Sequence, residues 1–296
     1  MPRDTRPRAY CELYLAFGEA AGLRPRTMEK YRYALNLFLD TPRLPDNVAE
    51  LEPEHAALWL AMMRKRGMAP GALSTYQRAV WTWFRWLAEH RYCPVDISRS
   101  VKRVRVPAPQ RRTASEEVKA GLLKVAHDRR DNRARNVALI EILWSTGVRR
   151  GELASIALED VNMDESTMYV RHTKTGKPRV VGIGRAARVA LLQYLLERGR
   201  EPGPLFLGRT GTALSNNGIR LVLRSLAASA GVSASSHDFR RACAANLIRA
   251  GVPIDSVARQ LGHSTIVMSL AYGEAGRTER ALADFHDADR GIRRIG

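Results

Sequence analysis

Apolar residues recur at helical spacing through most of the first hundred positions. They do so over residues 10–21, and again in a segment that Thr27 can cap. The second segment carries an apolar stripe formed by Tyr31, Leu35, Phe38 and Leu39. A third helix is predicted over residues 54–67, after Pro53, and a fourth over residues 72–89. Because amphipathic helices bury their apolar stripes against one another, this part of the chain is predicted to be a small helical bundle.

The fourth predicted helix is rich in aromatic residues, namely Trp81, Trp83, Phe84 and Trp86. Aromatic rings can stack on nucleic-acid bases, but this density on one helix is more typical of a bundle core. We therefore predict that these rings pack inside, and that the bundle presents its Arg and Lys residues at the surface.

A basic connecting segment follows the bundle. Residues 101–112 read VKRVRVPAPQRR, with two prolines that disfavour helix and five cations. The segment is predicted to be extended and able to follow a phosphate backbone. We place the domain boundary here, with a helical domain over 1–106, a linker over 107–112 and a second domain over 113–296.

The second domain shows a mostly helical pattern interrupted by one hairpin signal. Thr113 and Ser115 are suitable N-caps, and acidic residues follow them in the first turn. Alternating β-branched residues predict strands over 167–174 and 179–183, joined around Gly176. The sequence therefore predicts a mainly α protein with a small β-hairpin in its second domain.

The charge of the chain indicates a polyphosphate partner. The 296 residues carry a formal net charge of +18. Lys and Arg outnumber Asp and Glu by 18 to 11 over residues 1–106 and by 30 to 19 over residues 107–296, so both parts are basic. Such a surface favours nucleic acid through counterion release and electrostatic steering. From charge alone, a protein that is simply soluble and basic remains the alternative.

Composition also argues against several other classes of protein. No apolar run approaches the ~18 residues that cross a bilayer, and no apolar segment follows the N-terminus, so we expect no membrane association and a cytoplasmic location. Cys11, Cys93 and Cys243 are scattered and odd in number, which disfavours a disulfide framework or a zinc site. These cysteines are expected to be packing residues.

Four segments of the second domain carry candidate chemistry. They are the stretch STGVRRGEL over 145–153, Lys174 beside the hairpin turn, HDFR over 237–240, and LGH over 261–263 with Tyr272 nine positions later. Each alone is weak, because Arg-Arg pairs occur elsewhere in the chain and a lone tyrosine is usually a packing residue. Their order and spacing together make a specific pattern.

That pattern resembles the catalytic signature of the tyrosine recombinase and phage integrase family, and the resemblance covers nearly the whole chain. TGVRRGEL resembles the first-arginine motif of the family, and LGH followed by Tyr272 resembles its last motif. The resemblance implies an N-terminal core-binding bundle of the SAM-like type and a C-terminal catalytic domain. Because the helical pattern begins almost at the first residue, we expect no additional arm-binding domain, and the chain resembles the compact Xer type or a simple transposon integrase.

The resemblance implies which residues stabilise a phosphate under attack. Arg149 and Arg240 match the two catalytic arginines, His263 matches the position held by His or Trp, and Glu152 matches a supporting acidic residue. A phosphodiester attacked by a hydroxyl gains charge on its non-bridging oxygens, and guanidinium groups are permanently charged, fork-shaped donors for those oxygens. Losing one such donor typically costs ~10²–10³ in rate.

The resemblance also implies which residues transfer protons. Tyr272 matches the nucleophile, and because a tyrosine hydroxyl has a reference pKa of ~10, it needs a nearby base or cationic field. His237 is the candidate base. The leaving 5′-oxygen needs a proton, for which Lys174 is the favoured donor and Lys177 the competing one.

The expected function is therefore site-specific DNA recombination through a 3′-phosphotyrosyl intermediate, without metal, ATP or other cofactor. The expected partners are double-stranded DNA and other copies of the chain, as a tetramer on two DNA sites. A predicted helix over 277–289, with Ala281, Leu282 and Phe285 on one side, would dock on a neighbouring protomer or on its own domain. A type IB topoisomerase-like relaxase and a catalytically silent DNA-binding regulator are the alternatives.

Overall fold

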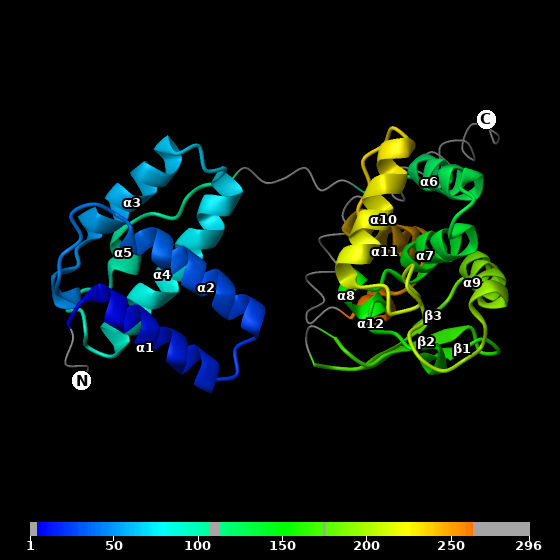
Figure 1. The fold of residues 1–296 in the computed structure, drawn as a ribbon, viewed down its shortest axis with the longest axis horizontal. Coiled ribbons are helices and arrows are strands. Elements are labelled where there is room, and N and C mark those ends of the chain that lie inside the picture. The colour runs from blue at the N-terminus through cyan, green and yellow to red at the C-terminus, as the bar shows by residue number, and fades with distance from the viewer. Residues whose placement is uncertain (1–4, 107–112, 174–175, 263–296) are drawn as a thin grey trace, which may run out of the picture. The chain divides into compact units, whose positions relative to one another are not determined.

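The structure, a computed structural model, describes residues 5–106, 113–173 and 176–262. The chain divides into two compact units, Met1–Pro109 and Gln110–Gly296, each with its own core (Figure 1). Within the described residues, no helix is long and apolar enough to cross a membrane. The predicted linker over 107–112 and the predicted helix over 277–289 lie outside the described residues.

The N-terminal unit is helical, as Figure 1 shows. Its elements are α1 (Pro7–Ala20), α2 (Pro25–Leu39), the 3₁₀ turn η1 (Val48–Glu50), α3 (Pro53–Lys65), α4 (Pro70–Glu89) and α5 (Ile97–Ser100). Each of α1 to α4 begins with a proline, whose fixed φ suits the first turn and whose missing N–H would have no partner there. The prediction that Thr27 caps the second helix is wrong, because α2 already begins at Pro25.

The aromatic residues of α4 lie in the core of this unit. Trp81, Trp83, Phe84 and Trp86 are all buried, which confirms the prediction that they pack inside. The ring of Phe38 from α2 meets Phe84 edge to face at 5.2 Å between centroids. The Trp83 Nε1 donates to the carbonyl oxygen of Tyr10 at 3.4 Å, so the indole is both packed and hydrogen-bonded.

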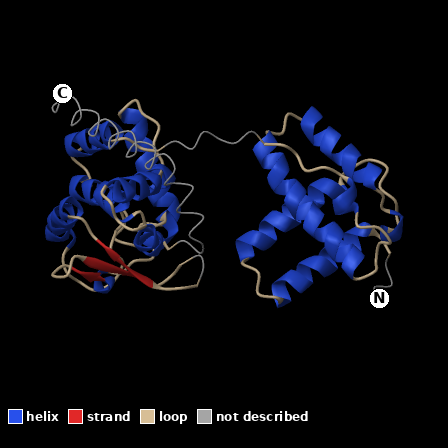
Figure 2. Ribbon diagram, turned by 180° about the vertical axis from the view of Figure 1, so that it is seen from behind, coloured by secondary structure: helices blue, strands red, loops and turns tan. Residues whose placement is uncertain are grey.

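The C-terminal unit is mostly helical with one small sheet (Figure 2). Its elements are α6 (Glu116–Asp128), α7 (Arg133–Thr146), α8 (Arg150–Leu153), η2 (Leu158–Asp160), β1 (Val161–Asn162), β2 (Thr167–Val170), β3 (Arg179–Gly182), α9 (Arg185–Arg198), α10 (Asn216–Ser229), α11 (Ser236–Arg249) and α12 (Ile254–Leu261). Helix α7 is the centre of the unit, because residues 135–144 are all buried and α6, α9 and α11 pack against it. Because α7 is buried on all sides, its apolar residues are not confined to one stripe, unlike those of a surface helix.

The sheet is antiparallel in the order β1-β2-β3, and Met168 of β2 pairs with Val181 of β3, both buried. The mainly α fold with a small hairpin is thus confirmed. The strand predicted over residues 167–174 corresponds to β2 and is shorter than predicted. It ends at Val170, and the next residue, Arg171, pairs with the buried carboxylate of Asp160.

Candidate active site

A tight turn between α7 and α8 presents Arg149. Gly147 ends α7 with φ at +60°, and a Cβ there would lie 2.5 Å from a methyl group of Leu261. The Thr146 hydroxyl supports the turn by accepting a hydrogen bond from the Val148 N–H at 3.3 Å. Arg149 is consequently held as the N-cap of α8.

The carboxylate of Glu152 joins two arginines. Its Oε1 accepts from Arg149 Nη1 at 2.8 Å, and its Oε2 accepts from the Arg149 backbone N–H at 2.9 Å and from Arg179 Nη2 at 2.8 Å. Burial raises the pKa of Glu152, but hydrogen bonds from Arg179 and Arg149 outweigh burial and lower the pKa below its ordinary value. Glu152 is therefore an ionised counter-ion for both guanidinium groups.

The first turn of α11 is fixed by a capping box. The Ser235 Oγ accepts from the Asp238 N–H at 3.4 Å, and the Asp238 carboxylate accepts from the Ser235 N–H at 2.8 Å. Asp238 also pairs with Arg241 at 3.2 Å. The acidic residue inside the HDFR motif thus has a local structural role.

His237, in this first turn, lies among cations. Partial burial is the largest cause that lowers its pKa, followed by the positive charges of Arg241, Arg240 and Arg150, while Asp238 raises it. The imidazole of His237 is therefore neutral near pH 7 and able to accept a proton.

Arg240 is buried and bridges two other segments. Its Nη1 donates to the Gly147 carbonyl oxygen at 2.7 Å and its Nη2 donates to the Leu261 carbonyl oxygen at 2.6 Å. Nearby, the Cys243 thiol donates to the Ser145 carbonyl oxygen at 3.2 Å, and burial raises its pKa to about 12 despite Arg240. All three cysteines are free and buried, which fits packing residues.

The C-terminal end of α12 collects three guanidinium groups. The carbonyl oxygens of residues 260–262 each accept one hydrogen bond from a different arginine. The pairs are Arg179 Nε to Gln260 at 3.1 Å, Arg240 Nη2 to Leu261 at 2.6 Å, and Arg149 Nη2 to Gly262 at 3.2 Å. The last carbonyls of a helix have no partner inside the helix and carry its negative end, so they suit cations. This helix end is followed directly by His263.

The structure brings Arg149, Glu152 and Arg240 together around the end of α12, and it places His237 one helical turn before Arg240. Lys174, His263 and Tyr272 lie outside the described residues. Arg179 was not among the sequence candidates, and the available signal was a charged residue at the start of a strand.

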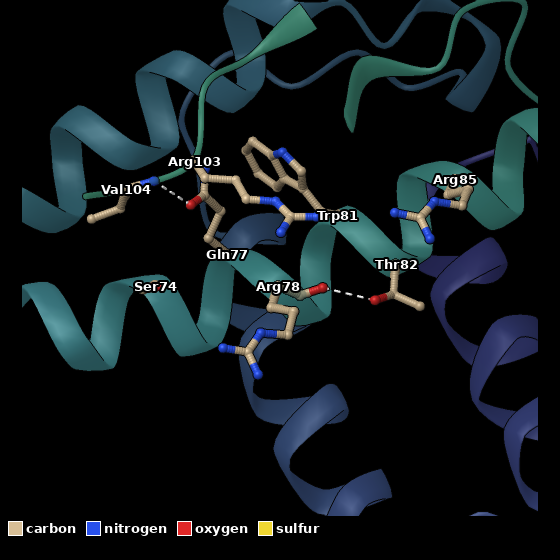
Figure 3. A pocket seen from close by; sticks show the side chains of 8 residues that line it. All are labelled: Ser74, Gln77, Arg78, Trp81, Thr82, Arg85, Arg103 and Val104. Atoms are coloured by element: carbon tan, nitrogen blue, oxygen red, sulfur yellow. Dashed lines mark hydrogen bonds between the residues drawn. The ribbon is translucent and has the colours of Figure 1, made fainter. Parts of the chain in front are cut away.

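A second feature of interest lies in the N-terminal unit, on α4. Ser74, Arg78, Thr82 and Arg85 share one face of this helix and line a pocket of about 130 Å³ together with Arg103 (Figure 3). Arg78, Arg85 and Arg103 are exposed, and none of them forms an ion pair within the described part of the chain. The pocket wall is therefore cationic.

Gln77 holds the segment that carries Arg103. The Gln77 Oε1 accepts from the Val104 N–H at 2.7 Å (Figure 3). The Gln77 Nε2 donates to the Lys102 carbonyl oxygen at 3.0 Å, so the side chain pairs with this segment as a neighbouring strand would. Trp81 Nε1 also donates to the Val101 carbonyl oxygen at 3.3 Å. Arg103 is thereby fixed beside the arginines of α4.

Comparison with known proteins identifies the family. The model of the phage integrase family matches residues 111–277, a stretch that includes every candidate from Arg149 to Tyr272. The chain is 26% identical over 269 residues to tyrosine recombinase XerA of Thermococcus kodakarensis, covering 90% of each protein. It is 31% identical over 204 residues to tyrosine recombinase XerD of Mycobacterium tuberculosis, covering 64% of each.

The fold is similar to that of lambda integrase in the crystal structure of a tetramer bound to a Holliday junction. The TM-score is 0.75 at 16% identity, over 92% of this chain and 78% of that one, a likeness that concerns the fold alone. The family match covers more than half of the chain and contains the whole predicted signature. The chain belongs to the phage integrase family.

Proposed function

We propose that this protein is a site-specific tyrosine recombinase that cuts and rejoins double-stranded DNA. The observation that carries the proposal is the convergence of Arg240 and Arg149 on Leu261 and Gly262 at the end of α12, eleven and ten positions before Tyr272 in a chain of this family. The XerA and XerD relatives are named tyrosine recombinases, and the similar lambda integrase structure is bound to a DNA junction. The comparisons give no support to a topoisomerase-like relaxase.

Charge on the phosphate is neutralised by the arginines. Arg149 donates Nη1 to Glu152 and Nη2 to Gly262, and Arg240 donates Nη1 and Nη2 to backbone carbonyls. Each guanidinium is permanently charged and carries fork-shaped N–H donors that suit the non-bridging phosphate oxygens. His263 adds a hydrogen bond to the same phosphate. Because the arginines are held by protein acceptors beforehand, little reorganisation is needed when charge develops.

The strand cut proceeds by transfer of the phosphoryl group to tyrosine. The Tyr272 oxygen forms a bond to phosphorus while its proton passes to the neutral His237, and the bond from phosphorus to the 5′-oxygen breaks as Lys174 gives that oxygen a proton. A 5′-hydroxyl from a partner strand then attacks the 3′-phosphotyrosyl group and releases Tyr272. One ester bond replaces another at each step, so no ATP is consumed.

The N-terminal unit contributes the DNA grip through the cationic pocket on α4. Arg78, Arg85 and Arg103 bind backbone phosphates, and the Ser74 hydroxyl adds a hydrogen bond. Phosphate contacts of this kind set affinity and register, whereas sequence is read at base edges. The 1–106 segment is accordingly the core-binding domain and 113–296 the catalytic domain.

The working assembly is a tetramer on two DNA sites in the cytoplasm, with the segment 277–289 exchanged between protomers. The lambda integrase structure that resembles this chain is a tetramer on a Holliday junction, which supports this assembly. Sedimentation of the full chain on a pre-formed junction tests it. A complex with one protomer per junction arm is expected, and a stable complex with fewer protomers contradicts it.

The decisive experiment replaces the nucleophile. Tyr272→Phe is expected to retain binding to the DNA site and to form no covalent adduct on a nicked suicide duplex. Adducts that persist in this variant would show that the nucleophile is another residue. Relaxation of supercoiled plasmid without site preference by the wild type would favour the relaxase, and failure to form adducts on any duplex would favour the silent DNA-binding protein.

A further inference from the structure

Arg179 opens strand β3, on the hairpin that also carries Lys174, and its side chain is turned inward. Only 10% of that side chain is exposed. Its Nη2 donates to Glu152 Oε2 at 2.8 Å, and its Nε donates to the Gln260 carbonyl oxygen at 3.1 Å. One guanidinium thus ties the hairpin both to the carboxylate that holds Arg149 and to the end of α12.

Gly262 packs directly against this guanidinium. A Cβ on residue 262 would lie 2.8 Å from the Arg179 Cζ and Nη1 atoms and 2.9 Å from its Nε. Gly262 also has φ at +65°, where side chains are strained. Glycine is therefore favoured at this position of the LGH motif for two reasons: the positive φ of its backbone, and the space next to it that Arg179 fills.

The Nε and Nη2 donors of Arg179 are both directed at protein acceptors, and the side chain is almost entirely buried. Its Nη1 is buried and has no hydrogen-bond partner among the described residues, so this third nitrogen does not face solvent either. Such an unpaired buried donor is unfavourable by itself. The other contacts of Arg179 with Glu152, Gln260 and Gly262 hold the group in place in spite of that.

Resting on the proposed function, we propose that Arg179 is a positioning residue of the recombinase site. It does not touch DNA. By binding Glu152 and the carbonyl of Gln260 together, it fixes Arg149 and the turn before His263 relative to the hairpin that carries Lys174. The three motifs come from distant parts of the sequence, and Arg179 is a side chain that contacts two of them from the third.

The chemistry of the contacts explains why an arginine is needed. The Nε and Nη2 donors diverge from one rigid plane and reach two acceptors at once, which a lysine ammonium on a flexible stem does not reproduce. Loss of the link lets the Arg149 turn and the end of α12 shift relative to the hairpin. A displacement of ~1 Å at a reacting group costs on the order of 10²-fold in rate.

The test measures single-turnover adduct formation by the full chain over a range of DNA concentrations. The probe is a nicked duplex bearing the sequence that the wild type captures covalently from a pool of random duplexes. Arg179→Gln is expected to lower the adduct rate at saturating DNA by about 10- to 100-fold. The half-saturating DNA concentration is expected to stay within about twofold of wild type, because Arg179 is buried and donates to protein acceptors.

Arg198→Gln is the matched control. Arg198 likewise donates to backbone carbonyl oxygens beyond a helix end, those of Gly199, Glu201 and Pro204, but it has no contact with the site. Its loss should lower the melting temperature and leave the saturating adduct rate within about twofold of wild type. A general loss of stability would slow both variants alike.

Arg179→Lys keeps the charge and provides the second test if the glutamine variant does not fold. Its saturating rate is expected to lie between those of wild type and Arg179→Gln. The proposal is overturned if Arg179→Gln or Arg179→Lys has the wild-type adduct rate at saturating DNA. It is also overturned if Arg198→Gln loses as much of this rate as Arg179→Gln, or if only the half-saturating DNA concentration changes. If the wild type itself forms no adduct, the proposed function fails instead, so the two failures are distinguishable.

Discussion

Replacing Glu152 by glutamine removes one charge from between two guanidinium groups. Glu152 has 3% of its side chain exposed and lies 2.8 Å from both Arg149 and Arg179. Breaking a buried ion pair by removing one partner costs about 3–5 kcal/mol, because the remaining charge is left uncompensated. In Glu152→Gln the side-chain NH₂ group would also face N–H donors of Arg149 or Arg179 in place of an acceptor oxygen. We therefore expect the free energy of unfolding to fall by about 3–5 kcal/mol.

The assay is thermal unfolding of the full chain at pH 7, measured by calorimetry. For a unit of this size each kcal/mol shifts the melting temperature by about 2–4 °C, so the transition of the C-terminal unit should fall by about 6–20 °C. Glu12→Gln is the control. Its side chain is 56% exposed and pairs with Arg32, which is 46% exposed, so its loss should cost no more than about 1 kcal/mol of stability. An equal, small shift in both variants would refute the reasoning.

The contribution of Glu152 to the stability of the fold should depend on pH. Because the folded pKa of Glu152 is lowered, its ionised form contributes stability that is present above the unfolded pKa of about 4.3 and is lost as pH falls through the folded pKa. The difference in melting temperature between wild type and Glu152→Gln should therefore narrow below about pH 4. A difference that stays constant or widens on acidification would contradict the assignment.

Three further predictions concern other parts of the molecule. The lowered pKa of His237 predicts an adduct rate that rises with pH through an ionisation below about 6.5 and is flat near pH 7. His237→Ala should lower the rate by ~10²–10⁴ and abolish this rise with pH. A rise that is unchanged in the variant argues against a base role for His237. Gly147→Ala should destabilise the C-terminal unit by about 2–5 kcal/mol in urea unfolding, more than Gly231→Ala, which shares a positive φ but has open space around it. Arg103→Gln should weaken binding to duplexes of any sequence and reduce the slope of log affinity against log salt by about 1, and an unchanged slope would remove Arg103 from the DNA interface.

Sequence reasoning was most successful where a pattern has a single physical cause. The density of aromatic residues on α4 predicted a core, and all four rings are buried. The alternation around Gly176 predicted a hairpin, which β2 and β3 form. The start of α2 was wrong because Thr27 was preferred as a cap over Pro25, although a proline at the first helical position is the stronger signal in this chain.

The candidate site was predictable as a set of residues but not as an arrangement. The motifs indicate Arg149, Glu152 and Arg240, and the family match confirms the family from which they were carried over. Their roles remain predictions, as do those of the candidates outside the described residues. Arg179 was missed because its role depends on contacts with residues 27 and 81 positions away in the sequence. No local period or spacing encodes such contacts.

The end of α12 also has a genetic consequence. Helix α12 has eight residues, and Val257 and Leu261 anchor it with fully buried side chains. Since three arginines from separate segments grip this one helix end, a cavity beneath Val257 would loosen all of them together. Loss-of-function alleles should therefore arise at plain aliphatic positions of α12, and a survey of inactive mutants would find them beside those at the charged residues.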